Sequence, residues 1–162
     1  MNNIVEATVE IPMGTKNKYE IDKKNHRIKL NRVQYSSMTY PAEYGFIDNT
    51  LERDGDPLDI LILTSEPTFP GCLIDAKIVG VLKTIDNGYE DNKIIAVNHT
   101  DPRFDDIDEL SDIKDHTKEE IKHFFKNYKT LQHIKVEVFD FYEKEEALKI
   151  LKECQDRYNS NN

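Results

Sequence analysis

The sequence predicts a mainly β, α+β protein in which a small closed barrel of strands is flanked by two helices in the C-terminal half. Short strand-like segments come first along the chain, and a helix, a strand and a final helix follow them. Proline and glycine interrupt the long, bent strands, which favours a closed barrel over a parallel sheet. The 162 residues suffice for one domain spanning 1–162.

The first predicted strands alternate between apolar and polar side chains. Residues 4–11 do so with the period of two that a half-buried strand shows. Residues 18–22 and 26–30 alternate in the same way and predict a hairpin. Within that hairpin Lys18 and Glu20 share a face, because side chains two residues apart in a strand point the same way. A half-solvated sheet is the ordinary explanation of this pattern.

Residues 32–50 are rich in aromatic side chains, proline and glycine, and this composition predicts a packed, irregular loop. Arg32 opens the segment, and Tyr40 and Tyr44 lie inside it. The tyrosine rings can pack in the core while their hydroxyls stay available for hydrogen bonds. Core packing therefore explains the rings without excluding contacts between the hydroxyls and a phosphate.

The centre of the sequence is an acidic turn, D-G-D-P-L-D at 54–59, which runs directly into an apolar strand at 60–63. Its glycine and proline favour a tight turn, so the carboxylates of Asp54, Asp56 and Asp59 can converge. An ionised Asp59 in a strand buried on both faces would cost roughly several kcal/mol without a nearby cation. Carboxylate-rich oxygen sites suit Mg²⁺ or Mn²⁺. The alternative is an acidic turn that only caps the strand.

Two further strands are predicted after this turn. Residues 73–83 form a long one, with one face expected to carry Ile74, Ala76, Ile78, Gly80 and Leu82. In the acidic segment 84–93, Asn87-Gly88 is a strong hairpin signal. Lys93 then opens a strand at 94–97.

The last third of the chain predicts a helix, a strand and a second helix. Thr117 and Glu120 form a candidate capping box at the start of the first helix. Its apolar face is expected to comprise Ile121, Phe124, Phe125 and Tyr128. A strand at 134–141 and a helix at 144–158 follow. We interpret the many acids of 98–116 as solvated surface charges.

The composition argues against two classes of partner. With 31 acidic and 22 basic residues the net charge is −9, whereas nucleic acids and anionic membranes require a basic surface. No apolar run approaches the roughly 18 residues of a membrane span, and residues 1–4 lack the features of a signal peptide. Cys72 and Cys154 lie far apart in the sequence, each in an apolar segment, which is typical of reduced cysteines in a protein core. We therefore expect a cytoplasmic protein.

A series of motifs runs along the chain beside D-G-D-P-L-D. They are Glu10-Ile11-Pro12, Lys18-Tyr19-Glu20-Ile21-Asp22, Arg32, Tyr40-Pro41, Tyr44-Gly45, Asp86, Asp91, Lys93 and Tyr128-Lys129. With these motifs in this order, the chain resembles the soluble family I inorganic pyrophosphatases of bacteria over nearly its whole length. The resemblance implies a five-stranded OB-like barrel with helices outside, magnesium-dependent hydrolysis of pyrophosphate to two orthophosphates, and a homohexamer.

The resemblance also implies roles for individual side chains. The implied ligands of two or more Mg²⁺ ions, which Mn²⁺ could replace, are Asp54, Asp59 and Asp91, with Asp86 and Glu20 acting directly or through water. Asp56 would lie beside the attacking water as general base, and Tyr44, Arg32 and Lys18 complete the implied catalytic set. The implied phosphate-binding residues are Lys18, Arg32, Tyr44, Lys93, Tyr128 and Lys129. Glu10 and Tyr40 would support the site.

This chemistry suits the residues, because pyrophosphate hydrolysis needs charge neutralisation and an in-line water more than covalent catalysis by the protein. Two neighbouring metal ions can lower the pKa of a shared water towards neutrality. Arg32 can hold phosphate oxygens bidentately, and the lysines supply point charges.

The chain departs from the family at two places. Glu43 precedes Tyr44 where many members carry asparagine, and the extra carboxylate is expected either to repel phosphate or to face solvent. The N-terminus is also shorter than in many relatives.

In the first predicted helix, His123 and Asn127 lie on a flank at i, i+4 spacing, where we expect a contact with another subunit of the implied hexamer.

Three alternative functions remain at this point. A phosphohydrolase acting on nucleotides or phosphoesters would need an apolar, aromatic pocket for a base, and no separate one is evident. A non-catalytic OB-fold module that binds nucleic acid would need a basic groove. A calcium-loop protein would need the glycine and terminal glutamate of an EF-hand, which do not follow Asp59.

Overall fold

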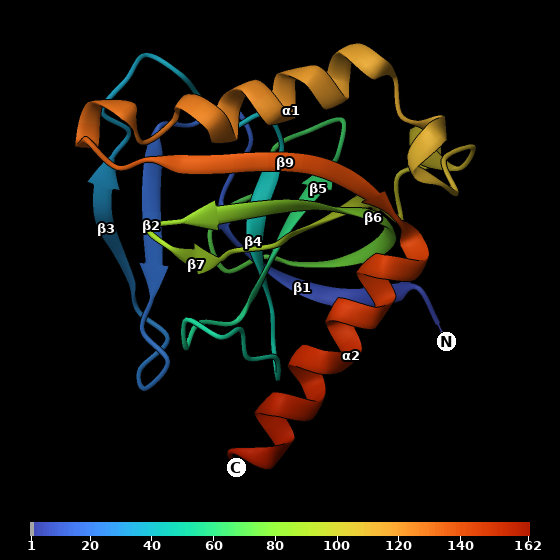
Figure 1. The fold of residues 1–162 in the computed structure, drawn as a ribbon, viewed down its shortest axis with the longest axis horizontal. Coiled ribbons are helices and arrows are strands. Elements are labelled where there is room, and N and C mark those ends of the chain that lie inside the picture. The colour runs from blue at the N-terminus through green and yellow to red at the C-terminus, as the bar shows by residue number, and fades with distance from the viewer. Residues whose placement is uncertain (1) are drawn as a thin grey trace.

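The computed structural model describes residues 2–162 and contains a closed ring of five strands (Figure 1). In ring order these are β1 (Ile4–Ile11), β4 (Glu43–Ile47), β5 (Leu58–Leu63), β8 (Lys93–Asn98) and β6 (Leu73–Asp86). The ring closes because β6 pairs back with β1. The β5–β8 pair is parallel and the other four ring pairs are antiparallel. The predicted closed, five-stranded architecture is confirmed.

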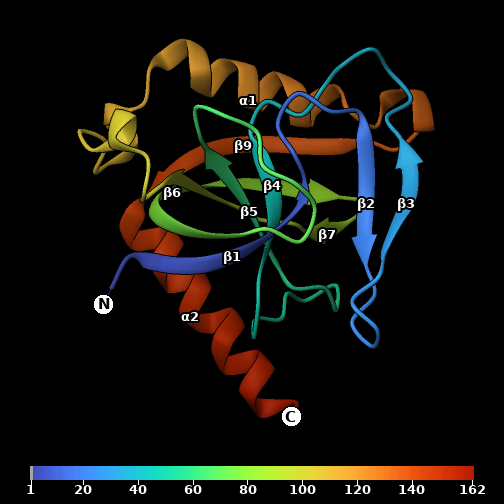
Figure 2. The same ribbon diagram turned by 180° about the vertical axis from the view of Figure 1, so that it is seen from behind.

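The remaining elements extend or cover this ring. Figures 1 and 2 show the hairpin of β2 (Asn17–Ile21) and β3 (Ile28–Val33), a separate two-stranded sheet. The short strand β7 (Tyr89–Glu90) and the strand β9 (Val136–Glu143) both pair with β6. The helices are α1 (Asp115–Asn127) and α2 (Lys144–Ser160), and 3₁₀ turns occupy Pro102–Phe104, Leu110–Asp112 and Thr130–Gln132. Among residues 2–162 no helix is long and apolar enough to cross a membrane.

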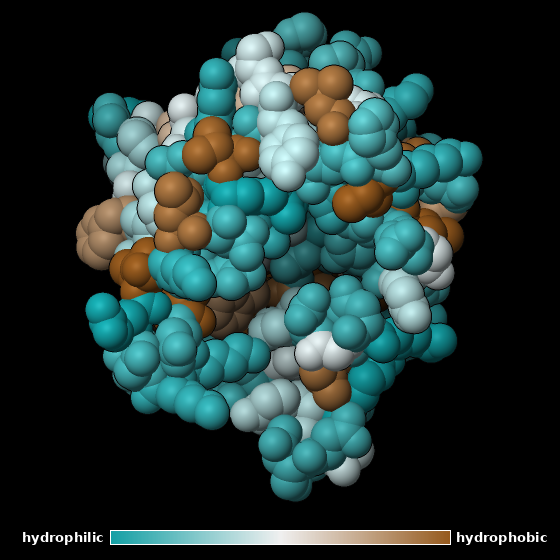
Figure 3. Space-filling model, turned by 90° about the vertical axis from the view of Figure 1, so that its left-hand side faces the viewer, coloured by the Kyte–Doolittle hydropathy of each residue, from teal (hydrophilic) through white to brown (hydrophobic). Residues whose placement is uncertain are grey.

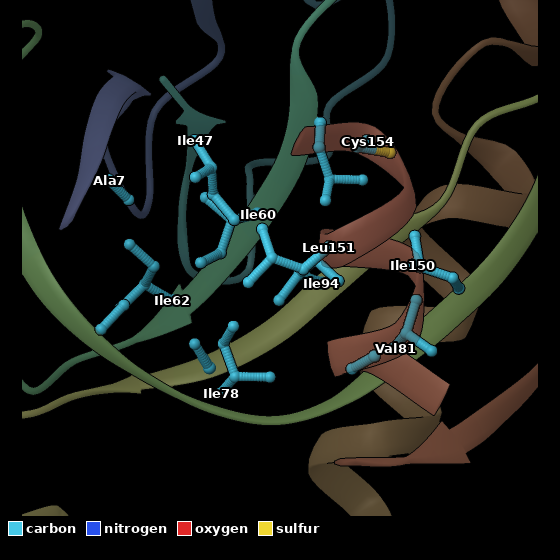
Figure 4. Packing of buried hydrophobic residues seen from close by; sticks show 14 of the residues in the cluster. Ala7, Ile47, Ile60, Ile62, Ile78, Val81, Ile94, Ile150, Leu151 and Cys154 are labelled. Carbon is cyan, nitrogen blue, oxygen red and sulfur yellow. The ribbon is translucent and has the colours of Figure 1, made fainter. Parts of the chain in front are cut away.

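Two apolar cores lie on opposite faces of the ring strands. One joins ring side chains to the apolar face of α2 and includes Ile60, Ile62, Ile78, Ile94, Ala147, Ile150, Leu151 and Cys154 (Figure 4). The other joins ring side chains to α1 and includes Leu61, Val79, Leu82, Ile95, Ile121, Phe124, Phe125 and Tyr128. Strands covered on both faces are continuous apolar runs rather than alternating ones. This arrangement explains the apolar sequences of β5 and β8 and confirms the apolar face predicted for the first helix, α1.

A β-bulge in β6 overturns the single face predicted for residues 73–83. The pairing register of β6 with β8 shifts between Ile78 and Gly80. One extra residue reverses every side chain beyond it. Ile78 therefore packs in the core with α2, whereas Leu82 packs in the core with α1.

The irregular loop predicted at 32–50 was wrong in part, because β3 runs on to Val33 and β4 lies inside the segment. Gly45 explains why the strand was missed, since it interrupts the apolar pattern of β4. A Cβ added at Gly45 would lie 1.9 Å from the carbonyl oxygen of Thr8 in β1. Glycine is therefore required for these two strands to pair.

The predicted capping box was also wrong. Helix α1 begins at Asp115, with Lys114 as its N-cap and no side-chain cap, so Thr117 lies inside the first turn. The acidic side chain of Asp115 stabilises the first turn through the helix dipole instead. The last strand begins at Val136 rather than at 134.

The acids of 98–116 are not all solvated. The side chain of Asp101 is buried and accepts hydrogen bonds from Ser65 N at 3.1 Å and Ser65 Oγ at 2.6 Å. It also caps the 3₁₀ turn Pro102–Phe104 by accepting a hydrogen bond from Arg103 N. Satisfied capping bonds of this kind allow one acid of an otherwise exposed segment to be buried.

Glu43 neither faces solvent nor approaches a phosphate site, so both expectations for it were wrong. Its side chain is fully buried and accepts hydrogen bonds from Thr68 N at 2.6 Å and Thr68 Oγ1 at 3.2 Å. Burial raises the pKa of Glu43, and the bonds from Thr68 oppose that rise. Glu43 therefore fastens the segment before β6 to β4.

Candidate active site

A cleft of about 460 Å³ gathers side chains from the hairpin, the ring strands, their loops and the end of α1. Every residue that the sequence analysis assigned to a site lines it: Glu10, Lys18, Glu20, Arg32, Tyr40, Tyr44, Asp54, Asp56, Asp59, Asp86, Asp91, Lys93, Tyr128 and Lys129. Figure 3 views the molecule from the side on which the β2–β3 hairpin lies in Figure 1, and mostly hydrophilic side chains surround a hollow there. The structure thus brings the whole predicted set together.

The β2–β3 hairpin supplies one wall of the cleft. Lys18 pairs with Arg32 across the two strands, and Glu20 follows Lys18 on the same face, as predicted. Burial lowers the pKa of Lys18, and the neighbouring charge of Arg32 lowers it further. Opposite them Glu10 of β1 has its pKa raised to about 7, first by burial. The positive charge of Lys18 opposes this rise in the pKa of Glu10.

Lys93 lies at the centre of the site, on the first residue of β8. The parallel register of β5 and β8 sets Lys93 beside Asp59. Its Nζ donates to Asp59 Oδ2 at 2.6 Å, to Asp91 Oδ2 at 2.8 Å and to Tyr44 Oη at 2.7 Å. Tyr44 Oη in turn donates to Asp59 Oδ2 at 2.9 Å. The cation that the sequence demanded beside Asp59 is therefore Lys93.

Burial and charge act in opposite directions on this cluster. Burial raises the pKa of Asp59, against the pull of Lys93, while the charge of Asp91 adds to the rise. Burial also acts to raise the pKa of Asp91, but Lys93 and the contact with Asp59 hold it below its usual range. For Lys93, burial favours the neutral amine, yet its carboxylate neighbours raise its pKa well above the ordinary value. When two carboxylates share one cation, their pKa values move apart in this way.

A second ion pair closes the cleft beneath α1. Lys129 Nζ donates to Asp86 Oδ2, and both side chains are largely buried. The position of Lys129 is fixed by its neighbour, because Gln34 Nε2 donates to Tyr128 O at 2.6 Å. The ring of Tyr128 packs on Phe124, with centroids 5.2 Å apart. The end of α1 is therefore held rigidly over the site.

The acidic turn forms the opposite rim. Gly55 has φ +92°, a left-handed conformation that suits glycine. Asp54 Oδ1 accepts a hydrogen bond from Asp56 N at 3.0 Å, which folds the turn so that both side chains line the cleft. Both remain solvent-exposed, whereas Asp59 is drawn into the sheet. Asp54, Asp56 and Asp59 therefore line one cleft, but among residues 2–162 they are not gathered closely enough to hold an ion together.

Comparisons with known proteins identify the chain's relatives. The model of the family described as inorganic pyrophosphatase matches residues 7–159. The chain belongs to the inorganic pyrophosphatase family. The inorganic pyrophosphatase of Halalkalibacterium halodurans is 54% identical over 155 residues, covering 96% of this chain and 95% of the relative. The inorganic pyrophosphatase of Geobacillus stearothermophilus is 52% identical over 158 residues, covering 98% of this chain and 96% of the relative.

Solved structures agree with this family assignment. The crystal structure of the inorganic pyrophosphatase from Thermus thermophilus superposes with a TM-score of 0.93 at 39% identity, covering 97% of this chain and 92% of that one. The structure of the Helicobacter pylori inorganic pyrophosphatase superposes with a TM-score of 0.94 at 37% identity, covering 97% of this chain and 94% of that one. The implied relationship to the pyrophosphatases and their fold is thereby confirmed.

The carboxylates of the site fit a hard divalent metal by donor chemistry, although their side chains are not gathered as a formed metal centre. Within the described residues, 2–162, no group of three or more carboxylate, histidine or cysteine side chains is arranged to hold an ion. Asp59, Asp91 and Asp86 instead contact the ammonium groups of Lys93 and Lys129. An all-oxygen, carboxylate-rich set is nonetheless the kind that magnesium and manganese prefer.

Two cleft residues with hydrogen-bonding side chains, Lys23 and Tyr89, were not assigned to the site from the sequence of this pyrophosphatase-family chain. Lys23 lies in the turn after β2 and Tyr89 in β7, and both are exposed at the cleft. No local signal marks Lys23, because the alternation of Lys18 and Glu20 extends to positions 22 and 24 and not to 23. No local signal marks Tyr89, because its position depends on the Asn87-Gly88 turn folding back on β6.

Proposed function

We propose that the protein hydrolyses inorganic pyrophosphate to two orthophosphates by the in-line attack of water, with magnesium bound. The observation that carries the proposal is the cleft, in which seven carboxylates and five cationic side chains face one another in a chain of this family. The excess of acids attracts metal cations, and the cationic side chains bind the phosphates.

The phosphate-binding work falls to residues on three walls of the cleft. Arg32 can hold two phosphate oxygens in parallel, and Lys18 beside it adds a point charge. Lys93 and Lys129 line the cleft with Tyr44 and Tyr128. The Tyr44 hydroxyl accepts from Lys93 and donates to Asp59, so it would donate to a phosphate oxygen by exchanging its bond to Asp59. We assign Tyr40 a supporting role, because it is buried and its ring packs on that of Phe124, with centroids 4.6 Å apart. Glu10 supports the site from β1.

Asp56 is the proposed general base, because it is exposed at the rim of the cleft and can reach a water there. Asp54, Asp59 and Asp91 would hold magnesium, with Asp86 and Glu20 acting directly or through water. When bound, two or more such ions would neutralise phosphate charge and lower the pKa of the attacking water. Manganese is the expected substitute.

Removing divalent metal is expected to abolish activity. Pyrophosphate turnover should fall to background in excess EDTA and return with Mg²⁺, while Ca²⁺ should substitute poorly because its looser coordination displaces the water. Phosphate release measured in the three conditions checks this prediction. Full turnover in EDTA, with metal analysis finding no ion bound, would contradict the metal-dependent mechanism.

We also propose that the protein works as a single domain in the cytoplasm and assembles as a homohexamer. The family match over 7–159 supports one domain, and Cys72 and Cys154 are free thiols, as in a reducing compartment. Exposed His123 of α1 lines a hollow of about 530 Å³ with Met38 and Pro41. This hollow is the surface that we assign to a subunit contact.

The hexamer is expected at neutral pH and should dissociate in mild acid, because an imidazole gains a proton there and loads charge into the contact. Analytical ultracentrifugation from pH 7.5 to 5 measures this. His123→Ala should resist acid dissociation, whereas His99→Ala, which removes an exposed histidine in the loop after β8, should not. A monomer at neutral pH would contradict the hexamer, and unchanged dissociation in His123→Ala would contradict only the role of the histidine.

A further inference from the structure

The loop that carries the acidic turn is hydrogen-bonded to helix α2 at Leu51. Leu51 N donates to the carbonyl oxygen of Cys154 at 3.0 Å, and Leu51 O accepts from Arg157 Nη1 at 2.7 Å. Both partners lie in the second half of α2. Figures 1 and 2 show the loop between β4 and β5 beside the lower half of α2 in both views.

Beyond Leu51 the turn is joined into one unit by hydrogen bonds across it. Glu52 N donates to Asp56 O at 2.8 Å, and Gly55 N donates to Glu52 O at 3.1 Å. Asp54 Oδ1 accepts from Asp56 N. A displacement of Leu51 would therefore carry Asp54 and Asp56 with it, because the turn has little freedom to deform internally.

Thr50 closes the base of the same loop. Thr50 Oγ1 donates to Ile47 O at 2.5 Å and accepts from Leu58 N at 2.9 Å. The base is thus fixed to β4 and β5, while the turn that bears the acids depends on α2 for its second support. Of the two bonds to α2, the one from Arg157 is charge-assisted and hence the stronger.

Arg157 also lies close to Glu52, a buried acid just before the acidic turn. Glu52 is 5% exposed, and its Oε1 has no hydrogen-bond partner among residues 2–162. Both side chains line a small cavity of about 140 Å³ between the turn and α2. The guanidinium of Arg157 therefore supplies a positive charge near the buried carboxyl group of Glu52, between the loop and α2.

We propose that Arg157 is a positioning residue for Asp54 and Asp56, acting through Leu51. It touches neither substrate nor metal; it fixes the rim of the cleft from the far side of the turn. The proposal rests on the proposed function, in which Asp56 activates water and Asp54 binds metal. Small displacements of such groups by remote changes can lower rates by up to about 10²-fold.

The test compares wild type with Arg157→Gln, Arg157→Lys and Lys149→Gln. Lys149 is the matched control, an exposed cation of α2 that lines the same cavity. In Arg157→Gln the amides of Leu51, Glu52, Gly55 and Asp56 should exchange with deuterium roughly tenfold faster, since a charge-assisted bond that limits local opening is gone. Arg157→Lys should restore part of the protection, and Lys149→Gln should match wild type.

Two functional readouts complete the test. Calorimetric titration should show Mg²⁺ binding several-fold more weakly to Arg157→Gln, and kcat for pyrophosphate should fall about tenfold with KM little changed, because the phosphate-binding residues lie on other elements. Unaltered exchange of the four amides, or equal effects in Lys149→Gln, would overturn the proposal. Deuterium exchange needs neither metal nor substrate, so it tests the positioning role of Arg157 independently of the proposed function. An inactive wild type, by contrast, would refute the proposed function.

Discussion

Asp56→Asn is expected to lower kcat for pyrophosphate by a factor of about 10²–10⁴, the usual contribution of a general base. Asparagine keeps the size of the side chain but cannot accept a proton from the attacking water. The backbone bond from Asp56 N to Asp54 Oδ1 does not involve the substituted group, so the turn should keep its fold. Steady-state kinetics over a range of pH measures the effect.

Asp59→Asn separates the two roles of the acidic turn. That variant should weaken magnesium binding, whereas Asp56→Asn should leave it close to wild type, because Asp56 is not a proposed ligand. Calorimetric titration with Mg²⁺ distinguishes the two. If Asp56→Asn retained near-wild-type kcat across the pH range, the assignment of the base would be wrong.

Lys93→Met is expected to lower the free energy of unfolding by about 3–5 kcal/mol at pH 8 in EDTA, the typical effect of removing one partner from a buried ion pair. The ammonium group is buried and contacts both Asp59 and Asp91, so its loss leaves two carboxylates uncompensated. Activity should also fall severely, because a phosphate-binding charge disappears. Urea unfolding monitored by circular dichroism measures the stability.

The pH dependence of this loss has a definite sign. Without Lys93, burial is expected to raise the pKa of Asp59 further above its unfolded value, so the penalty applies at high pH, where this carboxyl must ionise. The penalty should shrink as the pH falls and this carboxyl takes up a proton. Lys126→Met, at an exposed lysine of α1, is the control and should change little. A Lys93→Met protein as stable as wild type at pH 8 would contradict the ion-pair account.

Sequence patterns predicted much of this fold because its strands and helices carry strong local signals. The apolar run of β5 and the apolar face of α1 match the structure. The alternation predicted for β1 holds only in part, because the pairing register shifts between Val9 and Ile11, and Ile11 packs in the core with α1 while Val9 packs in the core with α2. Two of the failures occur where a non-local contact overrides the local pattern. Gly45 is required by the carbonyl of Thr8 in another strand, and the bulge near Val79 is set by pairing between β6 and β8.

The composition of the site was predicted better than its internal contacts. A buried acid at Asp59 demanded a cation, but the sequence alone could not say which one. The answer depends on the parallel register that sets Lys93 beside Asp59, a contact between residues 34 positions apart. The pairing of Lys129 with Asp86 and the support of Leu51 by Arg157 are likewise tertiary contacts without a local signal.

Phosphate release from pyrophosphate with Mg²⁺, measured beside ATP as the control substrate, tests the central claim most directly. The cleft gathers phosphate-binding cations and carboxylates around a small volume. We therefore expect two orthophosphates for each pyrophosphate consumed, and release from ATP that is slower by orders of magnitude. No release from pyrophosphate above the enzyme-free rate, or faster release from ATP, would contradict the account.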